Sequence, residues 1–394
     1  MNGSRLVASA ALILLGLASC KCAKPNYEQP LPPGARALLP LGPNDVVPDF
    51  AQQWNERGEI LPALDRSLEW TRKKVAPRYF PIEGITHERA LASLERMREL
   101  LQNSKSSSEF GRKVRDEFVV YKSAGWDAKG GGVLFTGYCT PILPGSRERT
   151  AECRYPLYAL PPDLVKGEQG EILGRRTASG ALEPYPTRAA IEKGSLLANQ
   201  GLELVWLRDP IDAFIAHVNG SAVVRLSDDQ LVRLGYAGKN GRPYSSLGKA
   251  LVADGQLKSD EVSLAKIRQW AQAHPERVPE YLGKNESYVF FTAIDGNPRG
   301  SLNVEVTGGR TLATDKTLFP RGAIVYVDTQ LSVGKHVRPY ERFLFDQDTG
   351  GAIRTAGRAD IYLGVGDEAE ALAGSTRSEG QLYYLFLRES VAQP

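Results

Sequence analysis

Residues 343–353 read Phe343-Leu344-Phe345-Asp346-Gln347-Asp348-Thr349-Gly350-Gly351-Ala352-Ile353, and residues 357–364 read Gly357-Arg358-Ala359-Asp360-Ile361-Tyr362-Leu363-Gly364. An apolar strand pattern leads into acidic residues, a two-glycine turn follows, and another acidic residue opens a second strand pattern. We therefore expect a hairpin that brings Asp348 and Asp360 together. Two carboxylates in a small, partly apolar pocket titrate at different pH values, so one can stay protonated near neutral pH and act as a general acid.

Each aspartate also has a structural interpretation. Asp348 precedes Thr-Gly-Gly, and an aspartate there can form a turn through hydrogen bonds from its side chain to the backbone. Asp360 lies inside a strand pattern, between Ala359 and Ile361, where Asp is disfavoured and an unused carboxylate would be costly. The sequence therefore favours Asp360 as the residue that does chemistry.

These two segments resemble the C-terminal three-aspartate segment of the membrane-bound lytic transglycosylase A family, whose members cleave the glycan strands of bacterial peptidoglycan. The third aspartate of that pattern corresponds to Asp315, in Ala313-Thr314-Asp315-Lys316. Further segments resemble the family in the same order along the chain. They are Phe135-Thr136-Gly137-Tyr138-Cys139-Thr140-Pro141, Tyr236-Ala237-Gly238-Lys239-Asn240-Gly241 and Asn285-Glu286-Ser287-Tyr288-Val289-Phe290-Phe291. Cys139 replaces a frequent Tyr and Glu286 replaces Pro, but the likeness extends over most of residues 133–389.

The resemblance implies a lytic transglycosylase that needs one carboxylate. Asp360 would protonate the bond between N-acetylmuramic acid and N-acetylglucosamine and then accept the proton of the C6 hydroxyl, giving a 1,6-anhydro product without water. Asp348 would be the neighbour that orients Asp360 and raises its pKa. The residues that we expect to line the glycan groove are Thr136, Tyr138, Lys239, Asn240 and, more weakly, Asp315.

Two other functions fit parts of the sequence. Asp348-Thr349-Gly350 after an apolar run has the form of an aspartic-protease triplet, but such an acid hydrolase needs two triplets and the chain holds no second Asp-Thr-Gly or Asp-Ser-Gly. The protein would then have to act as a homodimer. The second alternative is a non-catalytic peptidoglycan-binding lipoprotein, in which the aspartates only hold turns.

Composition excludes some classes of partner. The 394 residues carry 49 Lys and Arg against 46 Asp and Glu, a net charge of +3, so no large positive field exists and we expect no nucleic-acid partner. The cysteines lack the spacing of metal ligands and the four histidines are scattered, so we predict neither a metal site nor a cofactor.

The N-terminus has the form of a bacterial lipoprotein signal. Arg5 precedes an apolar run that is short for a membrane span, and Leu17-Ala18-Ser19-Cys20 closes the run with small residues. We expect residues 1–19 to be removed and Cys20 to be lipidated, with an ordinary secretory signal as the alternative. The lipid would place the protein at the periplasmic face of the outer membrane of a Gram-negative envelope. Glycan strands and the membrane would then be its partners, together with other cell-wall enzymes.

Export to an oxidising compartment also bears on the remaining cysteines. Cys139 and Cys153 would close a loop of about 15 residues, and a disulfide there would contribute about 3 kcal/mol by loop entropy. We take this pair as a disulfide candidate.

We expect a mainly β protein with a helical N-terminal part, in which Thr86 and Ser106 cap helices. The 39 Gly and 25 Pro support a turn-rich, strand-rich body, and the family likeness implies a double-psi β-barrel domain, an inserted smaller β-rich domain and a groove between them. The predicted divisions are a signal peptide at 1–19, a tether at 20–45, the catalytic barrel at 46–141 and 286–394, and the insertion at 142–285.

Overall fold

In the computed structural model, the N-terminal part of the chain is mainly helical. It holds one short strand followed by helices, the last of which ends at residue 117. The structure describes residues 25–167, 171–194, 196–259, 261–333 and 336–389. Thr86 and Ser106 cap helices as predicted, since their hydroxyls accept hydrogen bonds from Arg89 N and Glu109 N. The elements of this part are β1 (Leu38–Pro40), η1 (Ala51–Glu56), α1 (Arg57–Thr71), η2 (Ala76–Tyr79), α2 (His87–Asn103) and α3 (Ser107–Glu117).

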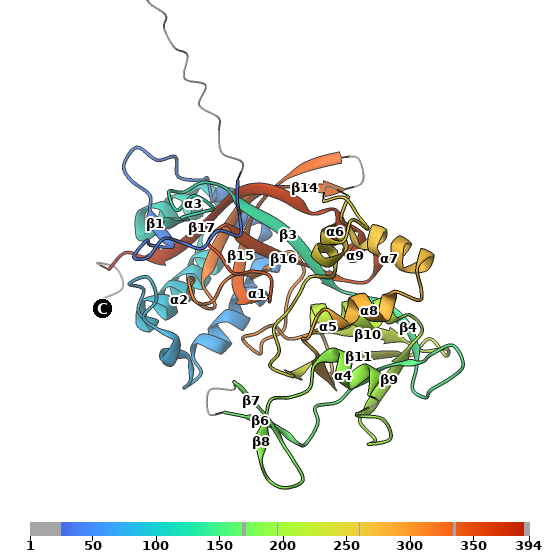
Figure 1. The fold of residues 1–394 in the computed structure, drawn as a ribbon. Coiled ribbons are helices and arrows are strands. Elements are labelled where there is room, and N and C mark those ends of the chain that lie inside the picture. The colour runs from blue at the N-terminus through green and yellow to red at the C-terminus, as the bar shows by residue number, and fades with distance from the viewer. Residues whose placement is uncertain (1–24, 168–170, 195, 260, 334–335, 390–394) are drawn as a thin grey trace, which may run out of the picture.

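The first sheet closes into a barrel. Its order is β1-β2-β17-β14-β15-β13-β16-β3, and an additional pairing of β17 with β3 joins six of these strands in a ring (Figure 1). This confirms the prediction of a mainly β fold with a barrel and N-terminal helices. The strands, with the helix that precedes the last one, are β2 (Phe118–Ser123), β3 (Val133–Thr140), β13 (Thr311–Ala313), β14 (Ile324–Val333), β15 (His336–Asp348), β16 (Arg358–Val365), α9 (Asp367–Ser375) and β17 (Arg377–Leu387).

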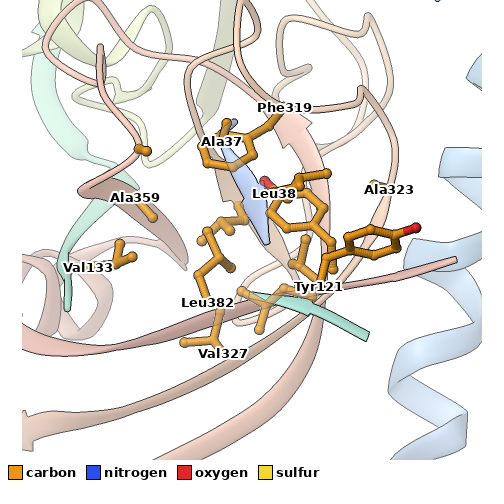
Figure 2. Packing of buried hydrophobic residues seen from close by; sticks show 14 of the residues in the cluster. Ala37, Leu38, Tyr121, Val133, Phe319, Ala323, Val327, Ala359 and Leu382 are labelled. Atoms are coloured by element: carbon orange, nitrogen blue, oxygen red, sulfur yellow. The ribbon is translucent and has the colours of Figure 1, made fainter. Parts of the chain in front are cut away.

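Apolar residues on both faces explain why parts of the barrel strands read as continuous apolar runs. In β17, Leu382, Tyr384 and Phe386 belong to one buried cluster, shown in part in Figure 2. Tyr383 and Leu385 belong to a second cluster, which they share with residues of α1, α2 and α3. The alternating side chains therefore pack either within the barrel or beneath the N-terminal helices.

A second sheet has the order β12-β11-β10-β4-β9-β5 and a small third sheet the order β6-β7-β8. We call residues 142–293, which hold both sheets and their helices, the inserted unit. Only Pro141 separates β3 of the barrel from β4. The domain divisions stay a prediction, and β12 pairs with β11 beyond the expected boundary at 285. The bounds are β4 (Ile142–Ser146), β5 (Tyr155–Tyr158), β6 (Leu164–Lys166), β7 (Ile172–Arg176), β8 (Leu182–Glu183), α4 (Arg188–Lys193), β9 (Glu203–Leu207), α5 (Pro210–Asn219), β10 (Ala222–Arg225), β11 (Leu231–Lys239), α6 (Leu247–Ala253), α7 (Leu264–Ala273), α8 (Val278–Gly283) and β12 (Val289–Ala293).

The segment predicted as a tether differs from the expectation. Leu38 pairs with Ser123 of β2, and Ala37 and Leu38 are fully buried. These two apolar residues stand among the prolines that suggested a tether, and their burial attaches the segment to the barrel. The signal peptide and Cys20 lie outside the described residues. Among the helices that are described, none combines the length and apolar character that crossing a membrane requires.

The disulfide candidate is wrong in this structure. Cys139 and Cys153 are both free thiols and both buried. Cys139 lies on β3 of the barrel, whereas Cys153 precedes β5 of the second sheet, so the short sequence separation does not reflect neighbouring strands. Burial raises the pKa of the Cys139 thiol to about 12, which makes it an unreactive thiol.

Candidate active site

Four residues on four adjacent strands form one row across the barrel. Ala313 of β13 pairs with Asp348 of β15 on one side and with Asp360 of β16 on the other. Asp360 in turn pairs with Thr136 of β3. The expected hairpin between the two aspartates is therefore wrong, because β13 lies between β15 and β16. The aspartates still share a site, since they occupy the same register position on either side of β13.

An irregularity in β15 decides which aspartate reaches this row. Leu312 pairs with Asp346, but the next residue of β13 pairs with Asp348, so Gln347 is extra. Leu312 belongs to the buried cluster of the barrel, and Asp346 opposite it is fully buried. The extra residue moves Asp348 to the other face, alongside Asp360. A bulge that re-aims a side chain is a recurrent feature beside active sites.

Asp360 has the properties of a general acid. The residue as a whole is partly exposed, but its Oδ1 is buried and has no hydrogen-bond partner among the residues that the structure describes. Burial raises the pKa of Asp360 from 3.8 to about 6; a hydrogen bond with Thr136 and the charge of Arg358 oppose this rise, and the charge of Asp348 adds to it. A carboxyl with this pKa holds a proton in mildly acidic solution and loses it just below neutral pH.

Asp348 is held by three donors. Its Oδ1 accepts hydrogen bonds from Ser301 N and Thr349 N, both 2.8 Å long, and its Oδ2 accepts one of 2.7 Å from the Tyr138 hydroxyl. Burial, followed by the Asp348 charge, raises the pKa of Tyr138 well above its usual value. The bond from Thr349 N confirms that Asp348 makes a local turn contact, and the bond from Tyr138 places it in the site as well.

Tyrosines and threonines continue the wall along β3 and β16. The Tyr138 and Tyr362 rings lie 5.1 Å apart between centroids, and the Tyr362 hydroxyl is 2.9 Å from Thr140 Oγ1. Sequence reasoning missed Arg358 and Tyr362. Their spacing of two residues on either side of Asp360 was a usable signal, because alternate residues of a strand share a face.

A pocket of about 250 Å³ lies between the barrel and the inserted unit, and of the wall residues named above Tyr138 lines it, whereas Asp348 and Asp360 do not. Tyr138 and Cys139 of β3 line it from the barrel, and most of the opposite side is apolar and comes from α5, α6 and α7. Tyr138 thus contacts both the pocket and Asp348. Within the described residues, no group of three or more His, Cys, Asp or Glu is placed to hold a metal ion.

Asn240, which was predicted to line the groove, makes structural contacts instead. Asn240 is 2% exposed, and its Nδ2 donates to the carbonyls of Pro186 and Glu286 while its Oδ1 accepts from Tyr288 N. These bonds leave the amide no free donor for a sugar. Lys239 is exposed at the end of β11, and its part in binding stays a prediction.

Asp315 is also buried, at 4% exposed. Its Oδ1 accepts hydrogen bonds from the backbone and the hydroxyl of Thr317, at 3.0 and 2.6 Å, so it holds the turn after β13. The buried carboxylate nearby that sequence reasoning missed is Asp346, which contacts Lys316 Nζ and, at 2.8 Å, the Tyr384 hydroxyl. This pair lies in the barrel interior, on the face opposite Asp360.

Two family models match the chain. The MltA specific insert domain matches residues 134–292, and the 3D domain matches residues 310–386. The membrane-bound lytic murein transglycosylase A of Escherichia coli (strain K12) is 33% identical over 270 residues, which cover 66% of this chain and 68% of that protein. The protein of the same name from Vibrio cholerae is 33% identical over 271 residues, which cover 67% and 68%.

Solved structures agree with these matches. A membrane-bound lytic murein transglycosylase from Agrobacterium tumefaciens superposes with a TM-score of 0.76 at 28% identity, covering 90% of this chain and 98% of that chain. The E. coli protein crystallised with bound chitohexaose has a TM-score of 0.67 at 25% identity, with coverage of 92% and 96%.

Proposed function

This chain belongs to the membrane-bound lytic murein transglycosylase A family and is a peptidoglycan lytic transglycosylase; from this premise we propose that Asp360 is its single acid and base. The proposed reaction cleaves the β-1,4 bond between N-acetylmuramic acid and N-acetylglucosamine and leaves a 1,6-anhydro-muramyl product. The observation that carries this proposal is the Asp360 carboxyl, whose Oδ1 is buried and unpartnered among the described residues and whose pKa burial raises to about 6.

In the first step, protonated Asp360 gives its proton to the glycosidic oxygen as the bond from that oxygen to the muramic acid C1 breaks. The leaving N-acetylglucosamine thereby departs as a neutral alcohol. A carboxyl held protonated by its surroundings suits this role, and general acid catalysis of this kind contributes about 10²- to 10⁴-fold. Asp360 Oδ1 is buried without a hydrogen-bond partner among the described residues, and protonation of the carboxyl removes the cost of leaving a charge there.

In the second step, the C6 hydroxyl of the same muramic acid attacks C1, and the Asp360 carboxylate takes up the hydroxyl proton. A C1–O6 bond replaces the C1–O4 bond, Asp360 regains its proton, and no water is consumed. Most glycosidases need a second carboxylate as nucleophile or base. Here all three donors to Asp348 are protein groups, which supports a role in shaping the site rather than attacking the sugar.

We assign the wall around Asp360 to the glycan. Thr136 and Tyr138 would position the sugar at the cleavage point, and the solved relative with chitohexaose supports a glycan strand as the ligand. Because the relatives are named membrane-bound, the protein is associated with the bacterial envelope. Anchoring through a lipid on Cys20 at the periplasmic face of the outer membrane, and contact with other cell-wall enzymes, remain part of the proposal.

Purified sacculi test the proposal directly. The wild-type protein should release soluble fragments, and mass spectrometry should find muramic acid ends lighter by one water than the hydrolysed form. Fragments with hydrolysed ends would overturn the single-acid transglycosylase mechanism. Binding to sacculi without any release would instead favour the non-catalytic wall-binding alternative.

A further inference from the structure

Arg358 lies two residues before Asp360 on β16 and takes no part in the steps above. Its side chain is 13% exposed, and its Nη2 lies 3.5 Å from Thr136 Oγ1. Its Nε is buried without a hydrogen-bond partner in the described part of the chain. A guanidinium remains charged in proteins, so the wall that carries Asp360 also carries a positive charge.

Residues 25–28, which we call the N-terminal segment, lie beside the Arg358 guanidinium. Arg358 Nη1 lies 3.7 Å from Glu28 Oε1, and Lys249 Nζ of α6 donates to the same carboxylate at 2.9 and 2.7 Å. Tyr27 fixes the segment on the barrel, since its hydroxyl donates to Glu379 and its carbonyl accepts from the Thr355 hydroxyl. Glu28 therefore bridges the barrel and the inserted unit beside the candidate acid.

We propose that Arg358 is a positioning residue for Asp360, and that the N-terminal segment balances its charge through Glu28 while Lys249 ties this carboxylate to the inserted unit. The inference rests on the acid and base role proposed for Asp360. It gives the segment that follows the predicted anchor a part in the reaction.

The charged groups around Asp360 determine how this arrangement affects its pKa. Arg358 lies on its own strand, Thr136 and Tyr138 lie on β3, and Asp348 lies on β15. Burial raises the pKa of Asp360, and among the charged groups Arg358 opposes the rise. The charge of Glu28 in turn opposes that of Arg358, and Arg377 of β17 adds a second positive charge near both. Exposed ion pairs add little to stability, so we expect the effect on proton binding rather than on folding.

The test compares the pH dependence of fragment release from sacculi by the full-length protein and its variants. Loss of the positive charge in Arg358→Met should move the upper pH limit of activity higher by about half a unit to one unit. Loss of the negative charge in Glu28→Gln should move that limit lower, because Arg358 then acts on Asp360 unopposed. Arg358→Lys should restore the limit toward the wild-type value.

Two further variants distinguish the charge effect of Glu28 on Asp360 from the loss of a contact with α6 and from the loss of an exposed ion pair elsewhere. Lys249→Met keeps Glu28 beside Arg358 but cuts the tie to α6, so we expect a higher KM and a smaller change in the pH limit than in Glu28→Gln, of opposite sign. Glu152→Gln makes the same chemical change as Glu28→Gln in another exposed ion pair, with Arg208, and should alter neither quantity.

Shifts of equal sign in Glu28→Gln and Arg358→Met, or no shift in folded Glu28→Gln, would overturn the inference. Since Glu28 is exposed, Glu28→Gln keeps the test decisive even if Arg358→Met fails to fold. A wild-type protein that releases nothing would overturn the proposed function and this inference together.

Discussion

The Tyr138 hydroxyl donates a 2.7 Å hydrogen bond to Asp348 Oδ2, although β3 and β15 are not neighbours in the barrel. Strands β16 and β13 lie between them, and β16 carries Asp360. The bond therefore links β3 and β15 across the two strands between them, one of which carries the candidate acid. Its strength comes from the charge of the acceptor, since hydrogen bonds to charged groups are about twice as strong as neutral ones.

Replacing Tyr138 with Phe removes this bond and keeps the ring contact with Tyr362. We expect turnover on sacculi to fall about tenfold, because a bond to a charged group contributes about 1.5–3 kcal/mol, part of which orients Asp348. Fragment release gives the turnover, and circular dichroism checks the fold. Turnover in Tyr138→Phe equal to that of the wild type would show that the bond does not serve the reaction.

Replacing Asp360 with Asn removes the proposed acid and keeps the shape of the side chain. Release of anhydro-muropeptides should fall at least 100-fold, the lower end of the general acid contribution of about 10²- to 10⁴-fold, while binding to sacculi persists. Asp315→Asn is a control, because Asp315 holds a turn with Thr317 and should change stability more than turnover. Retention of more than about a tenth of wild-type turnover by Asp360→Asn would contradict the assignment.

The raised pKa of Asp360 predicts a pH dependence of both activity and stability. As a general acid, Asp360 must be protonated, so activity should fall as the pH rises through about 6. The folded protein binds this proton more tightly than the unfolded chain, whose carboxyl has a pKa near 3.8. Stability is therefore lost between these two values as the pH rises.

Asp360→Asn has no such loss, so its free energy of unfolding should exceed that of the wild type by about 1–3 kcal/mol above pH 6. Urea unfolding at several pH values measures the difference, which should shrink toward pH 4. A difference that is independent of pH would mean that Asp360 ionises in the folded protein as it does in the unfolded chain.

Replacing Lys316 with Met removes the cation that is paired with the buried Asp346, whose pKa burial already raises. Asp346 is fully buried and Lys316 is 7% exposed, and removing one member of a buried ion pair costs about 3–5 kcal/mol. Urea unfolding should show this loss. The double variant Lys316→Met, Asp346→Leu should recover much of it, and a failure of Lys316→Met to destabilise would show that water reaches the pair.

The two buried thiols predict insensitivity to reduction. Because Cys139 and Cys153 are free and buried, a reducing agent should leave Tm unchanged, and both thiols should react with a thiol reagent only after unfolding. A drop in Tm of several degrees on reduction would reveal a disulfide in the protein as isolated from the envelope, since such a loop contributes about 3 kcal/mol.

Local signals in the sequence predicted local structure well. The caps at Thr86 and Ser106 depend on one side chain and the next turn of backbone, and the strand character of β15 and β16 is visible in their own residues. The residues of a strand do not show which other strand it pairs with. The segment Thr311–Ala313 is three residues long, too short for a periodicity signal, yet its insertion between β15 and β16 replaces the expected hairpin.

In the candidate site, too, features that depend on neighbouring residues were predictable and features that depend on distant contacts were not. Asp360 was identifiable because an aspartate inside an apolar strand pattern is costly without a function. Asn240 was predicted as a groove residue because a polar residue in a glycine-rich loop suggests ligand binding, whereas three backbone groups use up its amide. Ala37 and Leu38 are the opposite case, since two apolar residues among prolines give no sign that a barrel strand will bury them.

The single residue between β3 and β4 keeps the inserted unit close to the candidate site. Pro141 has a fixed φ, and its carbonyl accepts a 2.9 Å hydrogen bond from Val223 N of β10. On the barrel side of this joint, the Thr140 hydroxyl lies 3.2 Å from Ser221 Oγ and 2.9 Å from the Tyr362 hydroxyl. The joint between the two units is therefore hydrogen-bonded on both sides, and it couples the orientation of the second sheet to the strand that carries Thr136 and Tyr138.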